Sequence, residues 1–369
     1  MTAARLVMYM AIIIAVDIAF FFIQFALHKR MKWWLALILF VVKFALSALF
    51  ALLAVAITSP FGWQLTPLTI GLYLTCLGDC VADIVALIYC LAKKRPMNVW
   101  GRGVLGLIFV ICLTTFGMVN MQTINPQYHT YTSSKLEHEY KGIFVSDIHY
   151  GTAQFQSVVE KALLRIKNEN ADFLLLGGDI TDEYTSKEEM EWIFKKIGEI
   201  GIPTYFIYGN HDRQPKGDSW AGGRTYTDQE FIDAVLENGI EILKDDYVVF
   251  ADDLVILGRE DYSAGDDRLK VSELPILPTD KYVINMDHSP YQYDDITNTK
   301  ADLQLSGHTH GGQYFPMGFN LNIAVKNVYG SFKYGDTDLF VSAGFAGWKD
   351  PVKTHHFCNY EVIYLKPAK

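Results

Sequence analysis

The sequence is poor in cysteine: it has five among 369 residues, and Cys358 is the only one after residue 112. The last two-thirds of the chain therefore have no disulfide framework, and a zinc site built from several thiolates is excluded there. No GxxxxGKS/T or GxGxxG motif stands between a strand and a helix, which excludes the common glycine-rich phosphate loops. Internal repeats and low-complexity tracts are also lacking.

Acidic residues are scarce in the first third of the chain. Residues 1–124 contain nine basic and three acidic residues, a net charge of +6, whereas the remainder contains 23 basic and 38 acidic residues, a net charge of −15. A region this acidic repels the phosphate backbone, so we expect no nucleic-acid partner. The asymmetry indicates two regions that lie in different solvents.

Long apolar runs fill the first region. They cover approximately residues 6–27, 33–58, 67–92 and 103–124. Each reaches the roughly 20 residues that an α-helix needs to cross a bilayer. A cleaved signal peptide would account for the first run only, and its apolar segment would be shorter. The sequence therefore predicts an α-helical domain of four membrane spans over residues 1–124.

The basic residues of the connecting loops predict an orientation. Residues 28–32 (HKRMK) and 93–102 (KKRPMNVWGR) are rich in Lys and Arg, whereas residues 59–66 carry no charge. Because basic loops stay on the cytoplasmic side, the chain after about residue 125 is expected to lie outside the cytoplasm, attached to the cell membrane. Arg5 alone argues mildly against this orientation.

Four ionisable residues interrupt the apolar runs: Asp17, Lys43, Asp79 and Asp83. Ionisable groups are costly in a bilayer and usually face a partner or a polar cavity. Asp79 and Asp83 are four residues apart and therefore share one helix face. We favour pairing with Lys43 that holds the helices together, and an ion pathway is the alternative.

Strands and helices alternate after residue 140. Residues 125–140 (NPQYHTYTSSKLEHEY) lack periodicity and are expected to be a linker, which leaves residues 141–369 as the second domain. The alternation is typical of an α/β layered fold. Five apolar strands each run into a loop that bears Asp, Asn or His: 143–145, 173–176, 204–208, 282–286 and 303–305. Because ligands bind at the carboxyl ends of strands, we expect these loops to form one site.

The loops carry a set of polar residues without thiolates. The candidates are Asp147, His149, Asp179, Asp182, Asn210, His211, Asp212, His288, His308 and His310. Carboxylate, imidazole and amide groups suit Mn, Fe, Zn or similar divalent ions. Seven plausible ligands are too many for one ion, and they suit two ions that share a carboxylate, hold a phosphate and activate water.

The order DIH, GGDITD, GNHD, a lone His and GHTH resembles the calcineurin-like metallophosphoesterases, over about residues 141–365. The stretches GHTHGGQ and SAGFAGWKDPVKTHHFCNYEVIYL are similar to the membrane-attached bacterial branch, which includes UDP-2,3-diacylglucosamine pyrophosphatase-like enzymes. The resemblance implies a β-sandwich flanked by helices. It also implies two divalent metal ions, with Mn²⁺ the expected metal and Fe, Zn or Mg the alternatives.

The resemblance further implies a role for each candidate. One ion would be held by Asp147, His149, Asp179 and His310, and the other by Asp179, Asn210, His288 and His308. His211 would contact the phosphate and protonate the leaving oxygen, Asp182 would orient His211, and Asp212 would support the turn. The sequence departs from the family pattern at Asp287, before the lone His, and at Lys353, where relatives often carry Arg.

The predicted function is a membrane-bound, metal-dependent hydrolase of a phosphate ester or diphosphate. The membrane spans alone favour a lipid-linked substrate. The alternatives are a phosphatase of a soluble substrate that the spans merely anchor, and a non-enzymatic metal-binding membrane sensor, against which the intact ligand set argues. The loop of residues 213–226 has two interpretations. It could contact the substrate, with Arg213, Lys216 and Arg224 near a phosphate and Trp220 and Tyr226 near a base or lipid. Alternatively, it could be a solvated loop without a role in binding.

Overall fold

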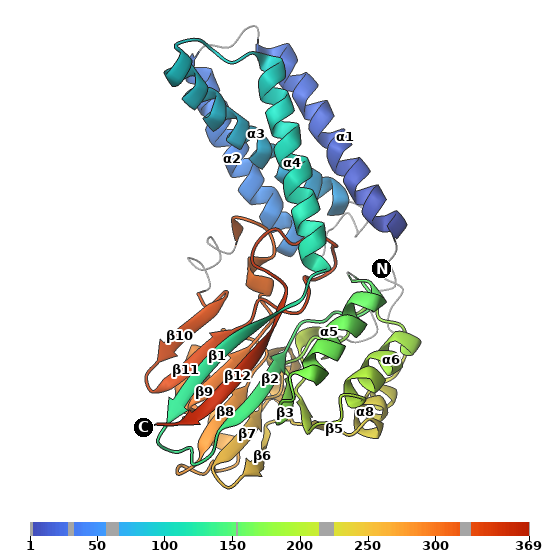
Figure 1. Ribbon diagram of the computed structural model, residues 1–369, viewed down its shortest axis with the longest axis vertical. Helices are drawn as coiled ribbons and strands as arrows, with labels where there is room; N and C mark the ends of the chain where they lie inside the picture. The colour runs from blue at the N-terminus through green and yellow to red at the C-terminus, as the bar shows by residue number, and fades with distance from the viewer. Residues whose placement is uncertain are drawn as a thin grey trace.

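The computed structural model describes residues 3–28, 33–56, 66–152, 154–213, 225–317 and 326–368. A bundle of long helices stands on one end of a two-sheet domain, and the N-terminal end of the first helix lies near that domain (Figure 1). The basic loop of residues 28–32 and the uncharged loop of residues 59–66 fall almost wholly outside the described residues.

Four apolar helices form the bundle: α1 (Ala3–His28), α2 (Trp33–Ala56), α3 (Thr66–Lys93) and α4 (Val99–Met121). Three stretches are long and apolar enough to cross a membrane, namely Ala3–Ala26, Pro67–Lys93 and Val99–Met121, and Leu35–Phe50 is a shorter apolar helix. The structure thus confirms the predicted helices, with three candidate spans and one shorter apolar segment among the residues it describes.

Three of the four ionisable residues in the apolar runs, Lys43, Asp79 and Asp83, form ion pairs with one another. Lys43 Nζ lies 3.1 Å from Asp79 Oδ2 and 2.5 Å from Asp83 Oδ2. Arg102 forms an ion pair with the other oxygen of Asp83. Charges that would be costly in lipid are thereby neutralised by partners on α2, α3 and α4. The predicted pairing with Lys43 is confirmed for Asp79 and Asp83.

Two six-stranded sheets make up the second part of the chain. The first has the order β1-β12-β2-β3-β4-β5 and the second the order β10-β11-β9-β8-β7-β6. The strands of the first sheet are β1 (Asn125–Ser133), β2 (Tyr140–Val145), β3 (Phe173–Leu176), β4 (Thr204–Phe206), β5 (Ile240–Ile242) and β12 (Asn359–Pro367). Those of the second are β6 (Asp246–Ala251), β7 (Leu254–Gly258), β8 (Tyr282–Met286), β9 (Leu303–Ser306), β10 (Gly330–Tyr334) and β11 (Thr337–Val341).

Alternating side chains of the first sheet face two different cores. Leu174 and Leu176 of β3 pack in the core shared with the helices, whereas Phe173 and Leu175 pack in the core between the sheets. A strand that is buried on both faces needs an uninterrupted apolar run, which is what FLLL supplies. The predicted layered fold, a β-sandwich flanked by helices, is confirmed.

Helices cover the outer faces of the sheets. The helices are α5 (Gln156–Asn168), α6 (Lys187–Gly198), α7 (Asn210–Arg213), α8 (Asp228–Glu237) and α9 (Tyr293–Asn298), with short 3₁₀ turns at Tyr262–Asp267, Val271–Glu273 and His310–Gly312. Ser186 caps the N-terminus of α6: its side chain accepts the backbone N–H of Glu189, and the side chain of Glu189 accepts the backbone N–H of Ser186. Its buried residues Met190, Ile193, Phe194 and Ile197 recur at helical spacing and pack on the first sheet.

The prediction of a linker over residues 125–140 is wrong for its first half. Residues Asn125–Ser133 form β1, which runs parallel to β12 at the edge of the first sheet. Its side chains alternate between partly buried and exposed rather than between apolar and polar. Because the partner strand begins more than 230 residues later, the local sequence has no apolar pattern that would predict a strand.

Candidate metal centre

The predicted ligands lie at the carboxyl ends of five strands, three in the first sheet and two in the second. Asp147 and His149 follow β2, Asp179 follows β3, Asn210 begins α7 after β4, His288 follows β8, and His308 and His310 follow β9. The strands of each sheet that carry these residues run parallel. Parallel strands end at the same edge of a sheet, and the two packed sheets bring both edges together.

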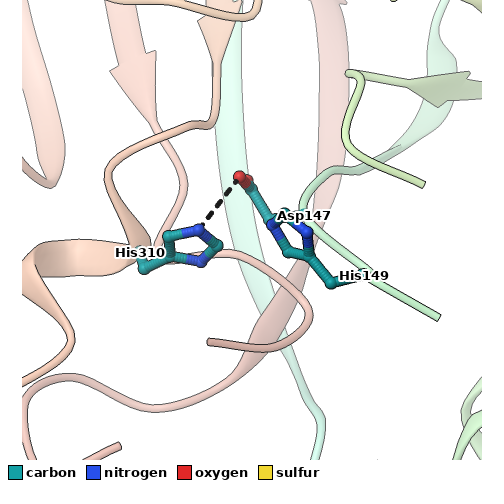
Figure 2. Close-up of side chains that lie close together, drawn as sticks. All are labelled: Asp147, His149 and His310. Carbon is teal, nitrogen blue, oxygen red and sulfur yellow. Dashed lines mark ion pairs between the residues drawn. The ribbon is translucent and has the colours of Figure 1, made fainter. Parts of the chain in front are cut away.

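One cluster contains Asp147, His149 and His310, whose ligand atoms lie within 4.8 Å of one another (Figure 2). His310 Nε2 is 3.8 Å from Asp147 Oδ1. His310 Nδ1 lies 3.2 Å from the carbonyl oxygen of Ala346. A proton on Nδ1 would be donated to that carbonyl, which directs the lone pair of Nε2 into the cluster.

A second cluster contains Asp179, His288 and His308. His288 Nε2 lies 3.1 Å from Asp179 Oδ2, and its Nδ1 lies 2.8 Å from the carbonyl oxygen of Gly177. Asn210 reaches the same cluster, because its Oδ1 is 2.8 Å from His308 Nδ1. Imidazole, carboxylate and amide donors therefore converge here as well.

Asp179 faces both clusters. Its Oδ2 lies 3.1 Å from His288 Nε2 in one cluster and 3.7 Å from His149 Nε2 in the other. Its Oδ1 accepts the backbone N–H of His211 at 2.7 Å, which fixes the direction of the carboxylate. Of the ligands, Asp179 has the geometry of a shared carboxylate between two ions.

Four buried atoms at the centre form no hydrogen bond with the described residues: Asp179 Oδ2, His149 Nδ1, His149 Nε2 and His288 Nε2. Burying a polar atom without a partner costs free energy, so native proteins rarely leave several together. Divalent cations held by the two clusters would satisfy Asp179 Oδ2 and the Nε2 atoms of His149 and His288. The side chains present thus fit two metal ions.

The charge states of Asp179 and His149 agree with metal binding. Burial raises the pKa of Asp179, but the imidazoles of His288 and His211 outweigh it and hold that pKa well below its usual range. Burial also lowers the pKa of His149. A carboxylate ion and a neutral imidazole are the forms that bind metals. At His288, burial lowers the pKa, but the carboxylate of Asp179 outweighs it and raises that pKa well above its usual range, so a metal ion would replace a proton there.

His211 lies beside the clusters with a carboxylate at its ring. Its Nδ1 is 2.7 Å from Glu183 Oε2. Burial lowers the pKa of His211, but the carboxylates of Asp179 and Glu183 outweigh burial and raise it to about 9. The ring centroid of Trp348 is 5.0 Å from that of His211.

The structure corrects the partner predicted for His211. Asp182 bonds elsewhere: it accepts from Thr152 Oγ1 at 3.1 Å and from the backbone of Tyr184 at 2.9 Å. Glu183, the next residue, supplies the hydrogen bond to Nδ1 of His211. The sequence reads DE at this point, and only the turn that follows decides which carboxylate reaches the ring. The sequence does contain a sign of this alternative, because a second acidic residue, Glu183, directly follows the GGDITD motif.

The other polar residues near the site support its loops. The carboxylate of Asp212 accepts the backbone N–H groups of Asp179, Thr181 and Gly209, so its predicted role in the turn is confirmed. Asp287 forms a two-point ion pair with Arg268 at 3.0 and 2.7 Å.

Lys353 also supports a loop, because its buried ammonium donates to the carbonyl oxygens of Ala343 and Ala346. Arg213, the last residue of α7, pairs with Glu260. The predicted phosphate contacts Lys216 and Arg224, and Trp220, lie outside the described residues.

The comparison with known proteins agrees with this geometry. Residues 141–312 match the family model described as calcineurin-like phosphoesterase. An uncharacterized metallophosphoesterase of Helicobacter pylori strain J99 is 26% identical over 236 residues, 63% of this chain and 60% of the relative. The uncharacterized metallophosphoesterase Cj0846 of Campylobacter jejuni is 26% identical over 299 residues, 78% of this chain and 77% of the relative.

A third relative, the phosphodiesterase YaeI of Escherichia coli K12, is 27% identical over 179 residues, 47% of this chain and 62% of the relative. The chain thus spans about 60% of the length of the first and third of these relatives. The family match covers the strands that end at the ligands, from β2 to the loop after β9. The second part of the chain is therefore a calcineurin-like metallophosphoesterase domain, joined to a bundle of apolar helices.

Proposed function

We propose that the chain is a membrane-attached phosphoesterase that uses two divalent metal ions to hydrolyse a phosphate ester or diphosphate. The observation that carries the proposal is the group of buried, unpartnered ligand atoms around Asp179. A purely structural charge cluster would pair these atoms with donors of the protein. The name of the Escherichia coli relative, a phosphodiesterase, is in keeping with this chemistry.

The proposal assigns seven ligands to two sites that share Asp179. Asp147, His149 and His310 complete one site, and Asn210, His288 and His308 complete the other. The donors are nitrogen and oxygen atoms only, which suit Mn, Fe, Zn or similar divalent ions. Manganese is the metal that the family resemblance leads us to expect. Two divalent ions, when bound, neutralise phosphate charge and lower the pKa of water.

His211 is the proposed acid for the leaving oxygen. Glu183 at Nδ1 keeps the ring in one orientation and favours its protonated form. The proton on the remaining nitrogen, Nε2, can then pass to the oxygen that leaves phosphorus. Positioned acids of this kind contribute roughly 10²- to 10⁴-fold to a rate.

A lipid-linked substrate is the finer part of the proposal. The loops that carry the site also contact the helix ends: Tyr73 of α3 donates to the carbonyl of Phe315, and Asn120 of α4 donates to that of Lys353 at 2.9 Å. Phe357 is 55% exposed, and its ring meets that of Phe116 on α4. A phosphate at the membrane surface would lie near these loops. Similarity to UDP-2,3-diacylglucosamine pyrophosphatase-like enzymes stays a prediction.

Hydrolysis of bis-p-nitrophenyl phosphate by the full chain in detergent tests the activity. We expect turnover with Mn²⁺ that a chelator abolishes and added Mn²⁺ restores. His211→Ala should lower kcat about 100-fold with unchanged metal content. His138→Ala should retain wild-type turnover, because this exposed histidine precedes β2 and lies at the end of that strand opposite to the ligands. Wild-type protein that is inactive with Mn, Fe, Zn and Mg would refute the proposal.

Two further measurements test the finer parts. Purified enzyme should hydrolyse lipid-linked diphosphates faster than soluble phosphate monoesters. The reverse preference would indicate that the membrane spans only anchor the domain and do not select a lipid-linked substrate. A His138→Cys variant should react with a membrane-impermeant thiol reagent from outside intact cells, because we place the domain outside the cytoplasm. Labelling from the cytoplasmic side alone would reverse that orientation.

A further inference from the structure

Trp348 packs against the proposed catalytic acid, although its own segment has no regular structure. Its ring centroid is 5.0 Å from that of His211, with an angle of 38° between the ring planes. Residues 342–358, between β11 and β12, contain no helix or strand. Something other than secondary structure must hold this ring in place.

Part of the restraint comes from Gln313, which lies three residues after the ligand His310. Its side chain accepts the backbone N–H of Trp348 at 3.0 Å and donates to the carbonyl oxygen of Trp348 at 3.1 Å. Both backbone groups of Trp348 are thus bound by one buried amide. The same amide donates to Tyr314 Oη at 3.1 Å.

The first membrane helix supplies the remaining contacts. Tyr9 of α1 donates its hydroxyl to one oxygen of Asp350, and Tyr314 donates to the other at 3.1 Å. Tyr9 and Asp350 are 2% and 1% exposed. A buried carboxylate that loses one of two donors bears a desolvation penalty, so the hydroxyl of Tyr9 is a strong restraint on the loop.

Arg5, one turn earlier on α1, joins two loops of the site. One guanidinium nitrogen donates to the carbonyl oxygen of Thr152 at 2.9 Å, and the other donates to that of Lys349 at 2.7 Å. Thr152 follows the ligand His149 and donates to its carbonyl oxygen at 3.0 Å. Arg5 therefore connects the loop after β2 with the loop that bears Trp348. Arg5 is also the basic residue that argued against the predicted orientation, and these two hydrogen bonds give it a structural role instead.

We propose that α1 is a positioning element of the phosphoesterase site, and that Arg5 and Tyr9 hold the segment Trp348–Asp350 so that the indole of Trp348 orients His211. The inference rests on the proposed function for the role of His211. Arg5, Tyr9 and Trp348 are positioning residues, because none of them belongs to either ligand cluster. The membrane helix then does more than anchor the domain.

The kinetic test uses the full chain in detergent with Mn²⁺ and bis-p-nitrophenyl phosphate. Arg5→Ala, Tyr9→Phe and Trp348→Ala should each lower kcat about tenfold through a small misplacement of His211, with KM and metal content close to wild type. Trp348→Phe, which keeps a ring on His211, should stay within about twofold. Arg95→Ala and Tyr89→Phe are matched controls, because these residues meet each other on the exposed far end of α3.

A second test needs neither metal nor activity. Hydrogen exchange of the metal-free protein should become about tenfold faster at the amides of Trp348 and Asp350 in Tyr9→Phe, while β3 exchanges as in wild type. The inference would be overturned if Arg5→Ala and Tyr9→Phe had the kcat and the amide exchange rates of wild type. Loss of metal from these variants would also overturn it, because that loss would indicate a general structural role. If wild type hydrolyses nothing, the proposed function fails, and the exchange result decides separately whether α1 holds the loop.

Discussion

Two loops of the site approach each other closely at Gly209, and replacing this glycine should disrupt the metal centre. A β-carbon at residue 209 would lie 2.5 Å from the backbone nitrogen and 2.8 Å from Cγ of Asp179, and closer still to its Oδ1. Ordinary contacts of a β-carbon begin at about 3.4 Å, so Asp179 would have to move by roughly 1 Å. A displacement of that size can cost about 100-fold in rate.

We therefore expect Gly209→Ala to lower kcat/KM by about 100-fold and to reduce the metal content, because Asp179 faces both clusters. Metal content is measured by atomic emission after dialysis, and activity with bis-p-nitrophenyl phosphate. The φ angle of Gly209 lies outside the left-handed region, so an alanine there has no backbone strain. The effect would come from the contact with Asp179 alone.

Gly239→Ala is the matched control. Gly239 has a φ of 72°, and nothing lies within 4 Å of a β-carbon built on it. This variant should lose about 1 kcal/mol of unfolding free energy through backbone strain and keep its metal and its activity. A Gly209→Ala protein with full metal content and wild-type kcat/KM would refute the reasoning, as would loss of metal from Gly239→Ala.

Four further variants test the separate metal sites, the ion pair of the bundle and a helix cap. His308→Ala and His310→Ala should each reduce the bound metal by about one ion per chain, because the two rings belong to different clusters. If metal analysis finds that either variant has lost both ions, the two sites are not separate. Lys43→Met should lower the thermal unfolding midpoint in detergent, since it leaves the partly buried carboxylate of Asp79 without its cation. An unchanged midpoint would argue against the pairing. Ser186→Ala should cost about 1 kcal/mol of unfolding free energy by removing a helix cap, with unchanged metal content, as followed by chemical denaturation.

The chemistry of the centre could be predicted from the sequence because it depends on residue type at strand ends. Asp147, Asp179 and His288 each follow a short apolar run, and parallel strands bring their carboxyl ends to one edge. The arrangement of the two sheets could not be predicted in this way, since strand order depends on pairing between distant segments. Strand β12, for example, lies between β1 and β2.

Contacts that depend on the local backbone conformation of a turn also could not be predicted from the sequence. Asp182 and Glu183 are adjacent carboxylates with the same chemistry, and the turn after β3 directs Glu183 to His211 and Asp182 to Thr152. The contact between Arg5 and Lys349 joins residues 344 positions apart. No local pattern encodes such a pair, because each partner looks like an ordinary surface residue in its own segment.

The backbone of the ligand residues explains why the centre is built on buried strands. Asp147, His149, Asp179, His308 and His310 all have φ between 45° and 71°, the left-handed region that side chains other than glycine rarely adopt. Each such residue costs of order 1–3 kcal/mol and persists only where the surroundings over-determine it. Here the restraint comes from the cores that hold β2, β3 and β9 and from the backbone bonds that Asp212 makes to the turn of Asp179. Flexible loops with the same side chains would relax out of this conformation and scatter the ligands, so the metal centre depends on the packed sheets as much as on the residues that line it.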